Sequence, residues 1–321
     1  MVIEIAASYK ALTNSGPFDF DDSVQLPDVY TTASLGFNLT GLGARGMEVP
    51  GEYGPEIAVS TLNFPLLLAS VNAAFHGGID FIQLNRNFQL HGGESSALRY
   101  HSALLDGVRT AAKIADVISG GGLNIEIPFD EEIGLPAVSG FLRNYKGRKS
   151  VSVAVKKSED FRLLEKFSAA AAANNLNVVA LCTNPDLLSD NAVRLAELVD
   201  AVQLRSGNIE QARRLRFLFH ELSEKTGRNV KLIIELGIVI SATLQSANER
   251  AALISELSHR QIFDGMPHAV GTVYDVADCV EKWIGMGGAD GILFTPASLP
   301  TDLASVLKGV VPLLNERAKS A

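Results

Sequence analysis

Four charged residues in the middle of this 321-residue chain could serve in catalysis or ligand binding. They are Glu126, Lys156, Arg205 and Glu235, each within or at the end of a β-branched, apolar run. A carboxylate there could transfer protons, and a cation could bind the anionic group of a ligand. Because an isolated buried ion is very costly, such charges must pair with one another or meet a ligand. Both outcomes stay open: a site for a polar or phosphorylated ligand, with Arg205 or Lys156 opposite its anionic group, or a salt-bridge network that fills the interior.

Further polar residues near the ends of these runs add to the set. His91, in the loop FQLHGGES, is the best-placed histidine for acid–base chemistry, and the plain alternative is an ordinary loop histidine. Thr183 and Asn184 precede an expected helix, which they could cap, or where they could contact a phosphate. We take as candidate catalytic residues His91 and Glu126, and as candidate cofactor-binding residues Asn85, Lys156, Thr183, Asn184 and Arg205.

Alternation along the expected strands decides which side chains share a face. In IDFIQLN, the apolar Ile82 and Leu84 should meet outer helices, so Gln83 and Asn85 should point into the interior. The same rule turns inward Asn124, Glu126, Ser152, Ala154, Lys156, Gln203, Arg205 and Glu235. Five strands would thus bring polar groups into one interior, near the carboxyl ends at which barrel enzymes build their sites.

From about residue 60 onward, short apolar runs alternate with amphipathic segments, as is typical of repeated β-α units and a parallel sheet. We predict strands at 2–8, 79–85, 123–128, 150–156, 177–183, 199–205, 230–240 and 290–295. We predict helices at 62–77, 98–118, 159–175, 187–197, 208–226, 246–264, 272–287 and 301–317. Eight such units favour a closed (β/α)₈ TIM barrel over an open doubly wound sheet, and we expect one domain over residues 1–321.

Three segments leave alternatives. The run VYTTASLGF at 29–37 could replace the first predicted strand or pair with it. Residues 10–60 are rich in Gly, Pro, Asp and Thr. The segment is longer than a simple connection between elements needs to be, so we expect it to cover the barrel mouth. Residues 131–149 should form a short helix or an irregular turn.

The composition favours a globular protein that acts on small molecules. The chain is 47% hydrophobic and 20% charged with a formal net charge of −8, which gives no electrostatic footprint for nucleic acid or an anionic membrane. No signal-peptide pattern or long apolar run is present, so we expect a cytoplasmic protein. The sequence has no CxxC or HxxxH motif for a structural metal and no P-loop motif for a nucleotide.

The C-terminal stretch from Val270 to Ala318 carries a series of turn and cap motifs. They are Gly271-Thr272, Val276-Ala277-Asp278, the turn from Gly287 to Gly291, and Leu299-Pro300. In order and spacing they resemble the end of the bacterial-luciferase-like flavin-dependent monooxygenases, in the branch of nitrilotriacetate and dibenzothiophene-sulfone monooxygenases. Leu195 to Ile254 and, more weakly, residues 104–127 are similar to barrel segments of that family.

This resemblance implies reduced FMN at the carboxyl-terminal mouth, its phosphate near the turn after the fifth strand, and a homodimer. Two motifs depart from the family. Residues 180–185 replace its Gln-Ala-Gly-X-Ser phosphate loop and lose the glycine that lets backbone N–H groups approach a phosphate, and residues 84–87 replace its usual Ala-Asp.

The expected function is therefore a flavin-dependent monooxygenase acting on a small organic substrate. Reduced FMN, supplied by a separate flavin reductase, or a deazaflavin in its place, would carry the chemistry while the barrel orients it. One alternative is a non-catalytic relative with a degenerate flavin site, whose interior charges pair with one another and which serves as a binding or partner subunit. Another is a barrel enzyme that uses Lys156 as a Schiff-base or general-base lysine.

Overall fold

Eight parallel strands close into a barrel in the structure, a computed structural model that describes residues 3–4, 32–42, 64–86, 88, 106–118, 120–142, 145–259 and 261–320. The barrel strands, in order, are β2 (Thr32–Asn38), β3 (Phe81–Leu84), β4 (Gly122–Glu126), β5 (Arg148–Ala154), β6 (Asn177–Cys182), β7 (Ala201–Leu204), β8 (Lys231–Ile240) and β10 (Gly291–Pro296). Each pairs in parallel with the next, and β10 pairs with β2 to complete the ring. The predicted (β/α)₈ barrel is confirmed.

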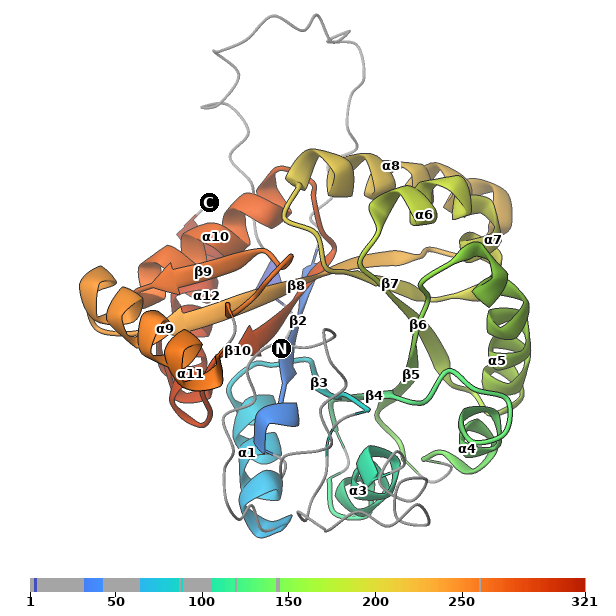
Figure 1. The fold of residues 1–321 in the computed structure, drawn as a ribbon, viewed down its shortest axis with the longest axis horizontal. Helices are drawn as coiled ribbons and strands as arrows, with labels where there is room; N and C mark the ends of the chain where they lie inside the picture. The colour runs from blue at the N-terminus through green and yellow to red at the C-terminus, as the bar shows by residue number, and fades with distance from the viewer. Residues whose placement is uncertain are drawn as a thin grey trace, which may run out of the picture.

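Helices surround the strands (Figure 1). They are α1 (Phe64–His76), α3 (Asp106–Ala115), α4 (Gly134–Gly140), α5 (Phe161–Ala173), α6 (Pro185–Asp190), α7 (Ala192–Leu198), α8 (Ile209–Thr226), α9 (Leu244–Ser258), α10 (Val273–Gly285), α11 (Thr301–Ser305) and α12 (Val311–Ser320). Short helical turns add η2 (Thr40–Leu42), η3 (Ser158–Asp160) and η4 (Val306–Val310). None of the helices within the described ranges is long and apolar enough to cross a membrane.

The main hydrophobic core fills the space between the strands and the helices. Outward-facing strand residues such as Ile82, Ile125 and Val153 pack there with helix residues such as Leu67 and Phe167, all of them buried. Alternate strand residues therefore face the barrel interior, as the period of two in a β-strand requires. The side-chain alternation predicted from the sequence is thus present in the fold.

The interior of the barrel has an apolar floor. Phe81, Val179, Ala201 and Leu293 are buried but do not belong to the core under the helices. Glycine at position 36 on β2 makes room for the Phe81 ring, since a Cβ there would overlap that ring. Above this floor the inward-facing positions become polar.

Aspartates that directly precede three strands tie the amino-terminal face of the barrel together. Asp80, Asp200 and Asp290 accept hydrogen bonds from backbone N–H groups of the adjacent strands β2, β6 and β8, at 2.8, 2.8 and 2.9 Å. Asp200 and Asp290 are also held by arginines, Arg228 at 3.0 Å and Arg216 at 2.7 Å. This end of the barrel is therefore built for stability.

The first predicted strand is wrong as a barrel strand. Within 2–8 the structure describes β1 (Ile3–Glu4), which pairs antiparallel with β2. The first barrel strand is β2, so the alternative at 29–37 locates it, and part of the segment 10–60 is regular structure. β2 closes the ring because it pairs with both β3 and β10.

The rest of 10–60, apart from 32–42, lies outside the described residues, so its expected role as a cover of the mouth stays a prediction.

Beyond the barrel, β8 continues and pairs in parallel with a strand that the sequence pattern did not predict, β9 (His268–Gly271). A second, smaller hydrophobic core forms on this extension from Val239, Ile254, Ile262, Phe263, Met266 and Ala297. It rests on the carboxyl-terminal side of the barrel, beyond the polar positions of β8.

Candidate functional site

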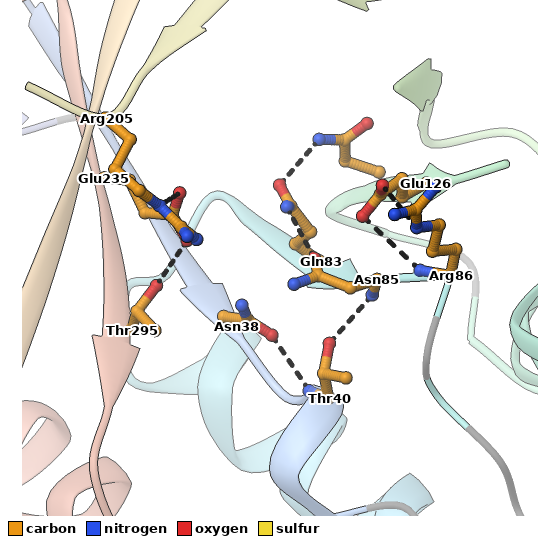
Figure 2. A network of polar contacts seen from close by, with 10 residues as sticks. Asn38, Thr40, Gln83, Asn85, Arg86, Glu126, Arg205, Glu235 and Thr295 are labelled. Carbon is orange, nitrogen blue, oxygen red and sulfur yellow. Dashed lines mark hydrogen bonds and ion pairs between the residues drawn. The ribbon is translucent and has the colours of Figure 1, made fainter. Parts of the chain in front are cut away.

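Inward-facing polar side chains gather near the carboxyl ends of the strands, where barrel enzymes build their sites (Figure 2). They fall into two hydrogen-bonded groups. One comes from β7, β8 and β10, and the other from β2, β3 and β4 with the turns that follow them. Apart from Arg205, the inward positions predicted on β3, β4, β7 and β8, together with Ser152 on β5, are buried: Gln83, Asn85, Asn124, Glu126, Ser152, Gln203 and Glu235.

The first group is a closed ion pair. Arg205 grips Glu235 with two hydrogen bonds, from Nε to Oε2 at 3.0 Å and from Nη2 to Oε1 at 2.8 Å. The hydroxyl of Thr295 donates to the same carboxylate at 3.1 Å. Their side chains are 12% and 4% exposed, so the two charges compensate each other in a place with little water. Sequence reasoning placed Arg205 and Glu235 correctly and missed Thr295, although the same alternation applied to GILFTP turns it inward.

The second group is a row of amides along the wall of β3 and β4. Asn124 Nδ2 donates to Gln83 Oε1 at 2.9 Å, and Gln83 Nε2 donates to Asn85 Oδ1 at 2.8 Å. The backbone N–H of Asn85 donates to Thr40 Oγ1 at 2.8 Å, and that of Thr40 donates to Asn38 Oδ1 at 3.0 Å. Each amide is thereby fixed in orientation. The sequence pattern turned Gln83, Asn85 and Asn124 inward but missed Asn38 and Thr40, which lie on and after the strand that it treated only as an alternative.

Glu126 ends β4 beside this row and is 1% exposed. Its partner is Arg86, in the turn after β3, whose Nε lies 3.6 Å from Oε1 and whose backbone N–H donates to Oε2 at 3.4 Å. The candidate catalytic carboxylate therefore faces the interior with its charge compensated. Sequence reasoning missed Arg86 because a turn, and not the strand pleat, directs its side chain.

Lys156 does not lie where the sequence predicted. It follows the end of β5 and its side chain is exposed, so the expected place in a water-poor interior is wrong. The pleat ends at Ala154, and the backbone N–H of Lys156 turns to donate to Asp160 Oδ2 at 2.8 Å. A Schiff-base or general-base lysine usually works in a desolvated pocket, whereas Lys156 is exposed.

The remaining candidates follow β6 and β3 in the sequence. Thr183 and Asn184 are exposed, and Asn184 caps α6 by accepting from the backbone N–H of Asp186 at 3.0 Å, as its default interpretation predicted. Burial raises the pKa of the neighbouring Cys182 thiol, which donates to the carbonyl of Asn184 at 3.3 Å. His91 lies outside the described residues, so its catalytic role stays a prediction.

A third buried carboxylate, Asp302, is fully buried and joins the loops after β8 and β10. It accepts from the backbone N–H groups of Ile240 at 3.1 Å and Ser298 at 3.0 Å, and Arg250 Nη1 lies 2.9 Å away. Burial raises the pKa of this carboxyl, while Arg250 opposes the rise. Through these contacts the carboxylate connects the end of β8 with the segment after β10. No sequence motif predicted this role.

Within the part of the chain that the structure describes, two buried polar atoms on the inner faces of β4 and β5 have no hydrogen-bond partner. They are Asn124 Oδ1 on β4 and Ser152 Oγ on β5, and the residues are 3% and 0% exposed. In folded proteins nearly all buried polar atoms are satisfied, so such atoms call for an explanation. The amide row explains why the oxygen of Asn124 is left over, since its nitrogen is used by Gln83.

No family model and no curated protein matches the chain in sequence. Among solved structures, the chain is similar to EDTA monooxygenase (EmoA) from Chelativorans sp. BNC1, with 14% identity over 89% of this chain and 94% of that chain and a TM-score of 0.65.

Two further similar structures are those of an FMN complex and of a coenzyme F420-dependent enzyme. One is the oxygenating constituent of 3,6-diketocamphane monooxygenase from Pseudomonas putida, in complex with FMN, with 9% identity over 89% of this chain and 98% of that chain and a TM-score of 0.55. The other is the coenzyme F420-dependent tetrahydromethanopterin reductase from Methanopyrus kandleri, with 10% identity over 88% and 99% and a TM-score of 0.54. The described part of the chain therefore has the (β/α)₈ barrel fold of the luciferase-like flavin-dependent monooxygenases.

Proposed function

We propose that the protein is a flavin-dependent monooxygenase that oxidises a small organic substrate with molecular oxygen, using reduced FMN as the electron donor. The observation that carries the proposal is the polar wall of Gln83, Asn85 and Asn124 inside a barrel of this fold, at the end where barrel enzymes bind their ligands. Fold alone does not determine function, so the residues of the wall have to suit the cofactor.

The wall suits the polar edge of a flavin ring. That edge carries an uncharged N–H donor between two carbonyl acceptors, and the wall offers the acceptor Asn124 Oδ1 and the hydroxyl of Ser152, which can donate. When bound, the reduced ring would supply the electrons for oxygen activation. Glu126, held in place by Arg86, is the proposed acid–base residue beside the ring.

Two of the residues predicted to contact the phosphate of FMN are already engaged within the protein. Arg205 is occupied by Glu235, and Asn184 by the first turn of α6. We therefore propose that the exposed Lys156 and Thr183, after β5 and β6, contact the phosphate at the mouth. A separate flavin reductase and a homodimer belong to the same proposal.

A second candidate function is a non-catalytic barrel that acts as a binding or partner subunit. The observation that favours it is the internal pairing of both interior carboxylates, Glu126 with Arg86 and Glu235 with Arg205. A charge that is already compensated needs no ligand.

Titration of the purified protein separates the two. Under anaerobic conditions, FMN, reduced FMN and coenzyme F420 are added in turn, and flavin absorbance, fluorescence and the melting temperature of the protein are followed. We expect saturable binding of FMN in either redox state, weakened roughly ten-fold or more by Gln83→Leu because that change leaves Asn85 and Asn124 without their shared amide. Gln245→Leu on the exposed surface of α9 is the matched control and should bind as the wild type does. No response to any of the three would favour the non-catalytic barrel.

A further inference from the structure

The unpartnered atoms Asn124 Oδ1 and Ser152 Oγ belong to neighbouring strands on the wall of the barrel. Asn124 is paired in register with Ser150, and Glu126 with Ser152, so the two residues are diagonal neighbours on adjacent strands and share the inward face. A buried polar atom without a partner raises the free energy of the folded chain, and a ligand that supplies the missing hydrogen bond removes that penalty.

The amide row determines which kind of group fits. Asn124 donates through its nitrogen to Gln83, and Gln83 donates onward to Asn85, so the atom that Asn124 presents is an acceptor. The hydroxyl of Ser152 can donate or accept. The pair therefore matches an N–H donor with a carbonyl acceptor next to it.

The acceptor at Asn124 does not suit an anionic group. A phosphate or carboxylate oxygen placed at Asn124 Oδ1 would set acceptor against acceptor. A neutral donor meets no such repulsion.

We propose that Asn124 and Ser152 form the subsite that recognises the ring of the cofactor, by accepting the imide N–H and donating to the adjacent carbonyl of the edge that FMN and deazaflavins share. The inference rests on the proposed function and adds to it which group of the ring each of the two side chains would bind. Gln83 and Asn85 are positioning residues, because they act through the orientation of Asn124.

The stability of the ligand-free protein gives the first test. Ser152→Ala removes a hydroxyl that has no partner, so its melting temperature should equal or exceed that of the wild type. Thr295→Val is the control, since the hydroxyl of Thr295 is bonded to Glu235 and its loss should lower the melting temperature. An equal drop in both variants would show that the Ser152 hydroxyl is already satisfied, by an internal water for instance, and would overturn the inference.

Binding of FMN and of 3-methyl-FMN, in which a methyl group replaces the imide hydrogen, gives the second test. The wild type should prefer FMN roughly ten-fold or more, and Asn124→Ala should reduce the preference to about two-fold, because the acceptor is gone and the methyl group has room. Equal affinity of the wild type for the two flavins contradicts this inference alone. Failure of the wild type to bind either flavin contradicts the proposed function, and the subsite falls with it.

Discussion

At the scale of single residues, Arg205 and Glu235 form an ion pair inside the barrel. Two hydrogen bonds join them, and both side chains are largely shielded from water. Breaking one side of such a pair leaves an uncompensated buried charge, which costs more than the intact pair contributes.

We therefore expect Arg205→Met to lower the free energy of unfolding by about 3 kcal/mol. The double variant with Glu235→Leu should recover much of that loss, because neither charge remains. Urea denaturation measures both, with Arg213→Met on the exposed surface of α8 as a control that should change stability by less than about 0.5 kcal/mol. Equal losses in the single and double variants would contradict an energetically coupled pair.

Much of the candidate site could be predicted residue by residue from alternation. It placed Gln83, Glu126 and Glu235 in the interior because each lies within or at the last residue of a strand. It failed for Lys156 and missed Arg86, since both lie two residues beyond a strand end, where a turn directs the side chain. The pairing of the charges could not be predicted, because it depends on which strands become neighbours in space.

At the scale of elements, α10 shows how a short motif starts a helix. Asp275 Oδ2 accepts from the backbone N–H and from the hydroxyl of Thr272, both at 2.7 Å, and the Thr272 hydroxyl accepts in return from the N–H of Asp275. The backbone hydrogen bond and then the side-chain hydrogen bond from Thr272 lower the pKa of Asp275 below its ordinary 3.8. The cap predicted at Thr272 is confirmed.

A lowered pKa in the folded state means that the carboxylate stabilises the protein above pH 3.8 and that this contribution is lost as the pH falls through the lowered value. Asp275→Asn should lower the melting temperature by about 2 °C at pH 7. The difference from the wild type should shrink on acidification below pH 3.8. A difference that persists unchanged in acid would show that the charge of Asp275 plays no part.

The order of strands and helices followed from the sequence because the β-α unit repeats along most of the chain. The pattern misplaced the first barrel strand, since VIEIAAS and VYTTASLGF both read as strands and only pairing with β3 and β10 distinguishes them. It overlooked β9, whose four residues are too few to show a period and which forms because β8 extends beyond the barrel. It also joined α6 and α7, which are separated at Asn191.

At the scale of the whole molecule, an apolar floor and a polar upper wall divide the interior of the barrel. The closed ring and its outer helices supply stability, which allows the wall to keep polar atoms that are not satisfied within the chain. Such a division is common where function requires a locally unfavourable arrangement. The fold could be predicted from the repeat, whereas the residues that would contact a cofactor phosphate could not, because residues 180–185 differ from the expected phosphate loop.

The central claim is that the polar wall of β3, β4 and β5 binds the ring of a flavin. A crystal structure of the protein grown or soaked with FMN tests it most directly. We expect electron density for the ring inside the barrel, with its imide edge within hydrogen-bonding distance of Asn124 and Ser152. An interior filled by the protein's own side chains, or a flavin bound only on the outer helices, would contradict the account.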